Sequence, residues 1–302
     1  MDVFTIKDLE NLTGIKAHTI RIWEQRYSFL KPTRSNSNIR CYNSDELRTI
    51  LNISLLNKYG YKISHINRMP EGEINEKILL LSQVEALQER LVNELIHCML
   101  ELNMEAFECK LDKYIRINGV EECILKIIFP FLERIGILWL TNHINPAQEH
   151  LVTNIIRSKI IVGIEGIKNK DRPDNPGKKV LLFLPEGENH ELGLLFIYYL
   201  LKKEGFTVLY VGANIPVKDL ASIARCKEPV ILYSHLTSVL QNFNLENFLL
   251  SIHKELSNFQ FVISGKLIQS YKKKFPPNIH FRKSIAEVMD CIVSLDKLSL
   301  AY

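Results

Sequence analysis

The residues best placed to bind a ligand follow three predicted strands in the C-terminal third of the chain. Pro185–Gly193 follows the first strand, Ser234–Leu236 follows the third, and Ser264-Gly265 follows the fourth. In a parallel sheet, ligands bind outside the carboxyl ends of the strands, where these segments meet. Neither GxGxxG nor GxxxxGK[ST] occurs there, so we expect neither a dinucleotide site nor a phosphate loop of the usual kind. The main candidate ligand-binding groups at this edge are the side chains of Glu188 and His190.

A second set of candidate residues joins two predicted helices. Trp139 ends one helix, and after nine residues the pair Glu149-His150 begins the next. Taken singly, the tryptophan is typical of a core position and the histidine of a structural one. Their spacing nevertheless brings an aromatic ring near an acid–histidine pair.

Strand and helix patterns alternate over residues 178–302. This alternation is typical of a parallel sheet with helices on both faces. The expected strands are Lys179–Leu184, Thr207–Gly212, Val230–Leu236, Phe259–Ser264 and His280–Lys283. The expected helices are Leu192–Lys203, Val217–Arg225, Leu245–Ser257, Leu267–Lys274 and Ile285–Leu295. We therefore expect a five-stranded parallel sheet in this region.

Residues 74–168 have an almost wholly helical pattern. We expect four helices with short connections, which favour antiparallel neighbours and hence a four-helix bundle. They are Ile74–Leu102, Met104–Ile117, Val120–Leu140 and Pro146–Lys168. Polar linkers rich in Pro and Gly bound this region near Met69–Gly72 and over 169–177. The pattern alone favours a spacer or a dimerisation bundle.

The N-terminal segment, residues 1–70, forms a basic module. It holds 11 Lys and Arg against 6 Asp and Glu, whereas the rest of the chain holds 27 against 28. Two short helical patterns separated by Thr13-Gly14 predict a helix-turn-helix. The polar segment Lys31–Tyr42 then predicts a hairpin wing with Arg34 and Arg40, suited to contacts with phosphates and the minor groove. This end of the chain is therefore expected to touch a polyanion.

This N-terminal segment resembles the winged helix-turn-helix of MerR-type transcription regulators. The resemblance covers residues 1–70 and rests on Thr19–Arg21, Trp23-Glu24, Arg26-Tyr27, Leu30–Pro32, Arg34 and Arg40–Tyr42. It implies that residues 16–27 enter the major groove of a double-stranded operator with inverted repeats, bound by a dimer or tetramer of the chain. The implied DNA contacts are His18, Thr19, Arg21, Arg26, Tyr27, Arg34, Arg40 and Tyr42.

The C-terminal pattern resembles the Rossmann-like (flavodoxin-like) cobalamin-binding domain. The motif of that domain begins with an acid, any residue, His, two residues and Gly, and continues further along the chain with Ser-x-Leu and then Gly-Gly. Here Ser234 follows Gly193, and Gly265 follows Leu236, at the intervals of the motif. The resemblance implies that His190 ligates cobalt from below and that Glu188 holds its other ring nitrogen. Gly193, Ser234, Leu236, Ser264 and Gly265 then line a slot for the displaced nucleotide tail.

The spacing of Trp139, Glu149 and His150 matches a bundle that caps the upper face of cobalamin in light-responsive MerR-type repressors of carotenoid synthesis. This match implies adenosylcobalamin as the cofactor. Three positions depart from the pattern. Ser264 replaces the first Gly of the pair, and Glu188 stands where many corrinoid enzymes have Asp. Leu140 stands beside Trp139, where light-responsive members have a cobalt-ligating His, and His143 is the nearest substitute.

The expected architecture is thus multi-domain: a winged helix-turn-helix (1–70), a four-helix bundle (74–168) and a cobalamin-binding domain (178–302). The expected function is a cobalamin-controlled DNA-binding regulator, in the sense of a repressor. Three alternatives are a regulator of the same fold that has lost cobalamin and senses a protein partner, a corrinoid methyl-carrier module, and a MerR-type metal or thiol sensor. No nucleophile–base constellation indicates an enzyme.

The composition also bears on the compartment. The longest apolar stretch, residues 124–140, is interrupted by charged residues and Pro130, so no membrane span is expected. Six scattered cysteines without a CxxC pair argue against a zinc ribbon or a disulfide scaffold. Free thiols of this kind are typical of the reducing cytoplasm.

Overall fold

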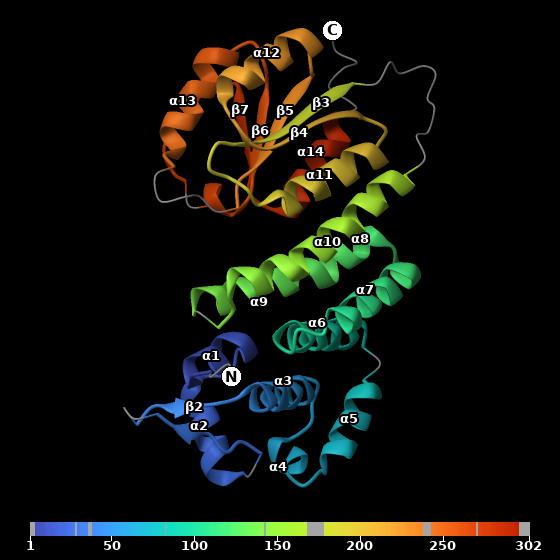
Figure 1. The fold of residues 1–302 in the computed structure, drawn as a ribbon, viewed down its shortest axis with the longest axis vertical. Coiled ribbons are helices and arrows are strands. Elements are labelled where there is room, and N and C mark those ends of the chain that lie inside the picture. Colours follow the sequence, from blue (N-terminus) through green and yellow to red (C-terminus); the bar gives the residue numbers. More distant parts are fainter. Residues whose placement is uncertain are drawn as a thin grey trace. The chain divides into compact units, whose positions relative to one another are not determined.

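The computed structural model describes residues 4–27, 29–35, 38–81, 83–141, 143–167, 178–237, 243–269 and 271–295. The chain divides into two compact units, Met1–Ile156 and Arg157–Tyr302 (Figure 1). In the described part of the chain, no helix has both the length and the apolar character that a membrane crossing requires.

The first unit begins with the expected winged helix-turn-helix. Its elements are α1 (Ile6–Thr13), α2 (Ala17–Arg26), the antiparallel wing strands β1 (Thr33–Arg34) and β2 (Arg40–Cys41), α3 (Ser44–Lys58) and α4 (Ile63–Ile66). A capping box between Thr5 and Asp8 starts α1, and Gly14, with φ +74°, ends it. A second capping box, between Asn43 and Glu46, starts α3. Local capping therefore fixes both ends of α1 and the start of α3.

The bundle helices of the first unit depart from expectation at two places. They are α5 (Glu71–Leu79), α6 (Val84–Leu100), α7 (Met104–Asn118), α8 (Val120–Cys123), a π-helical turn (Ile124–Ile128), α9 (Phe129–Leu140) and α10 (Pro146–Gly166). The expected helix Ile74–Leu102 is wrong: α5 and α6 are separate and run in different directions, and both pack on α3 (Figure 1). The expected helix Val120–Leu140 contains the π turn because Pro130 has no amide hydrogen to donate.

The second unit holds the expected five-stranded parallel sheet. Its strands are β3 (Lys179–Pro185), β4 (Thr207–Ile215), β5 (Ile231–His235), β6 (Phe261–Ser264) and β7 (Ile279–Arg282), in the order β4-β3-β5-β6-β7. Numbered along the domain, this is the 2-1-3-4-5 order of flavodoxin-like sheets. The strand order reverses between β3 and β5, which confirms the flavodoxin-like prediction.

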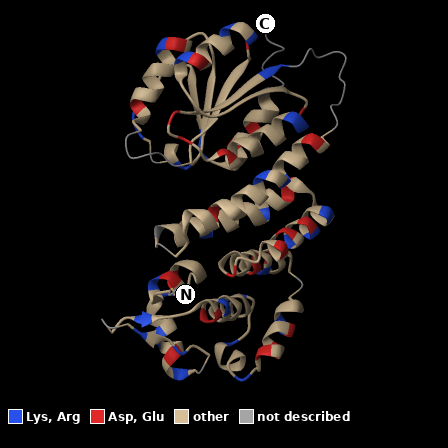
Figure 2. Ribbon diagram, in the orientation of Figure 1, with Lys and Arg blue, Asp and Glu red and all other residues tan. Residues whose placement is uncertain are grey.

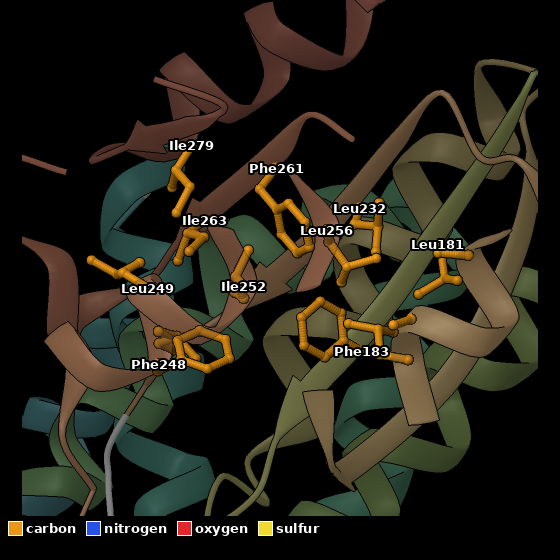
Figure 3. Close-up of a cluster of buried hydrophobic side chains, with 14 of the residues drawn as sticks. Leu181, Phe183, Leu232, Phe248, Leu249, Ile252, Leu256, Phe261, Ile263 and Ile279 are labelled. Atoms are coloured by element: carbon orange, nitrogen blue, oxygen red, sulfur yellow. The ribbon is translucent and has the colours of Figure 1, made fainter. Parts of the chain in front are cut away.

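Helices cover both faces of this sheet. Figure 1 shows α11 (Glu191–Lys203) and α14 (Ile285–Leu295) on one face and α12 (Val217–Lys227) and α13 (Leu245–Leu256) on the other. Side chains of the strands pack against α12 and α13 in a continuous apolar core (Figure 3). The expected helix Leu267–Lys274 is wrong, because only a 3₁₀ turn, Lys266–Ile268, forms. Three consecutive lysines and then two prolines follow it, and neither favours helix continuation.

A buried contact ties the loop after α9 to the helix-turn-helix within the first unit. Nε2 of His143 lies 2.7 Å from Oδ2 of Asp8, and the two side chains are 10% and 4% exposed. The imidazole also packs against Phe4, with ring centroids 4.6 Å apart. Asp8 is at the same time the acceptor in the capping box of α1. The segment that follows Trp139 is therefore anchored to the start of the helix-turn-helix.

The pKa of Asp8 should make this anchor sensitive to acid. Burial raises that pKa, but hydrogen bonds from Thr5 and His143 outweigh burial and hold it below the ordinary value of 3.8. A carboxyl with a lowered pKa stabilises the fold above its ordinary pKa, and this stability is lost as the pH falls through the lowered value. We expect His143→Ala to lower the free energy of unfolding by about 1–3 kcal/mol, because it removes a donor from a buried carboxylate.

Denaturant unfolding followed by the fluorescence of Trp23 and Trp139 measures this effect. Asp8→Asn should flatten the loss of stability below about pH 4, since it removes the titrating group. Glu10→Gln is the matched control: it changes an acid of the same helix that pairs with Lys7 and Lys16 at the surface. A stability of His143→Ala equal to that of the wild type shows that the contact with Asp8 does not hold the loop.

Candidate functional site

A fully buried carboxylate organises the carboxyl ends of β3 and β5. Oε1 of Glu188 accepts the backbone N–H of His190 at 2.9 Å and lies 2.7 Å from its ring Nδ1. Oε2 accepts the backbone N–H of Thr237, just after β5, at 2.9 Å. A carboxylate at Nδ1 places the ring proton on that nitrogen, so Nε2 carries the lone pair. The His190 side chain is 57% exposed, and its imidazole is held in the tautomer that a metal ligand requires.

The predicted tail-slot residues lie at the same edge of the sheet, at the carboxyl ends of β5 and β6 and in the first turn of α11. The strand order reverses between β3 and β5, which is where open sheets of this kind form a crevice. Ser234, at the end of β5, is fully buried, and its Oγ has no hydrogen-bond partner among the described residues. Gly265 has φ +109°, and a Cβ there would overlap the backbone of Leu236. The sequence therefore needs glycine at this position for close packing.

These residues fit the lower side of a corrinoid. A neutral imidazole nitrogen suits cobalt as a ligand, and the buried carboxylate behind it keeps the ring oriented. A buried hydroxyl without a partner among the described residues, such as that of Ser234, costs free energy unless a partner meets it. Sequence reasoning missed His235, whose ring lies between Gly193 and Ser264. Its position between two motif residues, Ser234 and Leu236, was the available signal.

The bundle residues predicted to face the cofactor lie on either side of one short loop. Trp139, near the end of α9, is 45% exposed. In the first turn of α10, Glu149 is half-buried, and its Oε2 lies 3.4 Å from Nε2 of the exposed His150. His143, the expected substitute for a ligating histidine beside Trp139, is bound to Asp8 instead. That expectation is therefore wrong for this conformation.

The predicted DNA contacts divide into accessible and buried residues. On α2, His18, Arg21 and Arg26 are exposed, whereas Thr19 and Tyr27 are half-buried. The wing carries the exposed Arg34, whose Nη1 donates to Oδ1 of Asn38 at 2.7 Å. Figure 2 shows positive residues on the wing strands.

Glu24 on α2 is the residue that holds the wing, and sequence reasoning missed this role. Nε of Arg40 lies 2.9 and 3.0 Å from the two Glu24 oxygens, and this hydrogen bonding raises the pKa of Arg40. The hydroxyl of Tyr42 donates to Oε2 of Glu24 at 3.0 Å. Tyr42 is fully buried, so its prediction as a DNA contact is wrong. Its ring and hydroxyl support the wing from inside.

A basic pocket lies elsewhere in the same domain. It has a volume of 360 Å³, sits around α4, and is lined by Gly60, Tyr61, Lys62, Ser64, His65 and Arg68. No sequence signal marks these residues, because they are spread around a turn and the single helical turn of α4. Among the described residues, no three His, Cys, Asp or Glu side chains gather in a way that holds a metal.

Two family models match the chain. The MerR helix-turn-helix regulatory family matches residues 4–73, which form the winged domain and the start of α5. A B12 binding domain matches residues 91–162, which cover most of α6 through most of α10. The chain thus combines these two kinds of domain.

Curated relatives and a solved structure are also similar to this chain. The transcriptional repressor CarA of Myxococcus xanthus is 28% identical over 71% of this chain and 70% of its own length. The repressor CarH of the same organism is 23% identical over 75% and 76%. The monomethylamine corrinoid protein of Methanosarcina barkeri matches 69% of this chain and 99% of its own, with a TM-score of 0.54 at 14% identity. This last likeness shows a shared fold.

Proposed function

We propose that this chain, a MerR-type regulator that carries a B12-binding module, is a transcriptional repressor whose hold on its operator is controlled by cobalamin. The observation that carries the proposal is the imidazole of His190, fixed by the buried Glu188. The same chain has a winged helix-turn-helix. Both curated relatives are named as repressors, which favours a regulator over an enzyme or a methyl-carrier module.

On the cofactor side, each residue of the sheet domain has a defined task. His190 would hold cobalt through Nε2, and Glu188 keeps the proton on Nδ1. Ser234 and Gly265 would line the slot for the nucleotide tail, and Gly265 lets the β5 and β6 ends approach. Cobalamin itself supplies a cobalt ion whose lower base a protein imidazole can replace. The cofactor is therefore held by a ligand whose tautomer is set before binding.

We expect His190→Ala to lose the base-off, histidine-on absorption spectrum and most of the affinity for adenosylcobalamin, because it removes the lower ligand. Absorption spectra of purified protein with micromolar adenosylcobalamin measure both. His280→Ala, on β7 of the same domain, is the control and should keep the wild-type spectrum. Wild-type protein that retains no cobalamin, or a His190→Ala spectrum equal to the wild type, contradicts the proposal.

On the DNA side, we propose that α2 enters the major groove and the wing contacts the adjacent backbone. The contacts proposed are His18, Thr19, Arg21, Arg26, Tyr27, Arg34 and Arg40. Arg34 is exposed at the wing, whereas Arg40 is paired with Glu24. Loss of Arg34 should therefore affect DNA binding alone, whereas loss of Arg40 should affect both DNA binding and stability.

We expect Arg34→Ala to weaken operator binding and to reduce the salt slope of log K by about one, because one phosphate contact is lost. Its unfolding midpoint should match that of the wild type. Arg40→Ala should weaken binding and also lower the midpoint, since Glu24 loses its partner. Fluorescence anisotropy over a salt series measures the slope. Lys126→Ala, exposed in the bundle, controls for net charge. If the salt slope of Arg34→Ala equals that of this control, the wing does not contact the operator.

We further propose adenosylcobalamin as the native form, and a cytoplasmic dimer or tetramer as the species that binds DNA. Trp139, Glu149 and His150 then cover the upper face of the cofactor. The support is their spacing, the B12 match over the bundle, and the likeness to CarH and CarA. Adenosylcobalamin supplies a cobalt–carbon bond that light breaks.

Because Leu140 has no ligating group and His143 is bound to Asp8, we expect the light response to be reversible. Size-exclusion chromatography of the adenosylcobalamin complex should show a dark oligomer that dissociates in green light and reforms with fresh cofactor. Leu140→His should make the light product persistent. His143→Ala should respond to light as the wild type does. Irreversible dissociation in both the wild type and His143→Ala shows that neither position limits the switch.

A further inference from the structure

One histidine stands inside the tail slot. Nδ1 of His235 lies 2.7 Å from Oγ of Ser264, at the end of β6. On the other side of the ring, a Cβ added to Gly193, in the first turn of α11, would overlap the ring. The imidazole therefore spans the gap between two of the residues that line the slot.

Hydrogen bonding holds the ring in this place. The hydroxyl of Tyr233 donates to Oγ of Ser264 at 2.6 Å, so the Ser264 proton is directed to Nδ1 of His235. Burial lowers the pKa of His235 to about 4, against the attraction of Glu188. The ring is therefore neutral near pH 7, and its Nδ1 accepts. The serine that replaces the first glycine of the expected pair is the anchor for the histidine.

The ring and a nucleotide base compete for the same space. Both are planar aromatic groups, and protein interiors are packed too densely to hold two where one fits. Successive side chains of a strand point to opposite faces of the sheet, so His235 shares a face with its β6 partner Ser264 and not with Ser234. A tail that enters the slot between Gly193 and Ser264 has to take the space of the His235 ring.

We propose that His235 is a gate in the tail slot and determines which corrinoids the chain accepts, because a nucleotide tail enters only after His235 leaves Ser264. This inference rests on the proposed binding of cobalamin at His190. Corrinoids without a tail do not need the slot and bind without opening the gate. The gate thus separates recognition of the corrin ring from recognition of the tail.

Two probes that differ only in the tail test the gate: adenosylcobalamin and adenosylcobinamide, which lacks the nucleotide. Stopped-flow absorbance gives association rates, and equilibrium titration gives affinities. For the wild type, we expect the adenosylcobalamin rate to saturate with concentration, as gate opening becomes limiting, and the adenosylcobinamide rate to rise linearly. His235→Ala should bind adenosylcobalamin about tenfold more tightly, the effect of one lost hydrogen bond. It should bind adenosylcobinamide as the wild type does.

Ser264→Ala is the second variant, because it releases the ring without removing it, and it should accelerate adenosylcobalamin alone. Equal changes for both corrinoids, or no change for either in both variants, overturns the gate and leaves the proposed cofactor site intact. Wild-type protein that binds neither probe overturns the proposed function and the gate with it. An effect confined to the probe with a tail supports the gate.

Discussion

The lower-ligand site depends on one buried carboxylate. Glu188 is fully buried, and burying a charge without hydrogen bonds costs several kcal/mol. The loop after β3 and the end of β5 meet this cost together, through the backbone of His190, its ring and the backbone of Thr237. The strand order makes this possible, because it sets β3 beside β5 at the point where the strand order reverses. Without this carboxylate, the Nδ1–H tautomer of His190 loses the acceptor that selects it.

In the helix-turn-helix, two further carboxylates each hold together segments that are distant in the sequence. Glu24 accepts hydrogen bonds from Arg40 and Tyr42, and so fixes the wing to α2. Asp8 caps α1 and also receives His143 from the loop that carries the chain from α9 to α10. This second contact links the segment between Trp139 and Glu149 to the first helix of the DNA-binding fold. A change in that loop therefore has a direct path to α1.

Much of this architecture can be read from the sequence, because its signals are local. Alternating strand and helix patterns predict the sheet, Gly14 predicts the turn of the helix-turn-helix, and the same patterns predict that His190, Ser234 and Gly265 follow or end strands. The errors arise where a distant partner decides. The sequence predicts Tyr42 as an exposed residue of the wing, but Tyr42 is buried and donates a hydrogen bond to Glu24, which lies 18 residues earlier in the sequence.

Contacts with residues distant in the sequence also decide where α5 ends and where the rings of His143 and His235 lie. The separation of α5 from α6 depends on how both pack against α3, and the residues around Leu80 include no helix breaker. His143 finds Asp8 at the opposite end of the first unit's sequence. His235 is set by Ser264 and Gly193, which belong to two other elements. In each case the partner lies far away in the sequence, so the neighbouring residues do not predict it.

Electron paramagnetic resonance tests the central claim most directly, because the nitrogen that binds cobalt below the corrin splits the signal of the cobalt(II) form. Protein made with ¹⁵N-labelled histidine is loaded with cobalamin and reduced to that form. We predict that the triplet splitting from the axial nitrogen becomes a doublet, since a histidine of this chain is the ligand, and that His190→Ala abolishes the change. A triplet that persists in the labelled protein shows that the nucleotide base stays on cobalt, which contradicts the role assigned to Glu188 and His190.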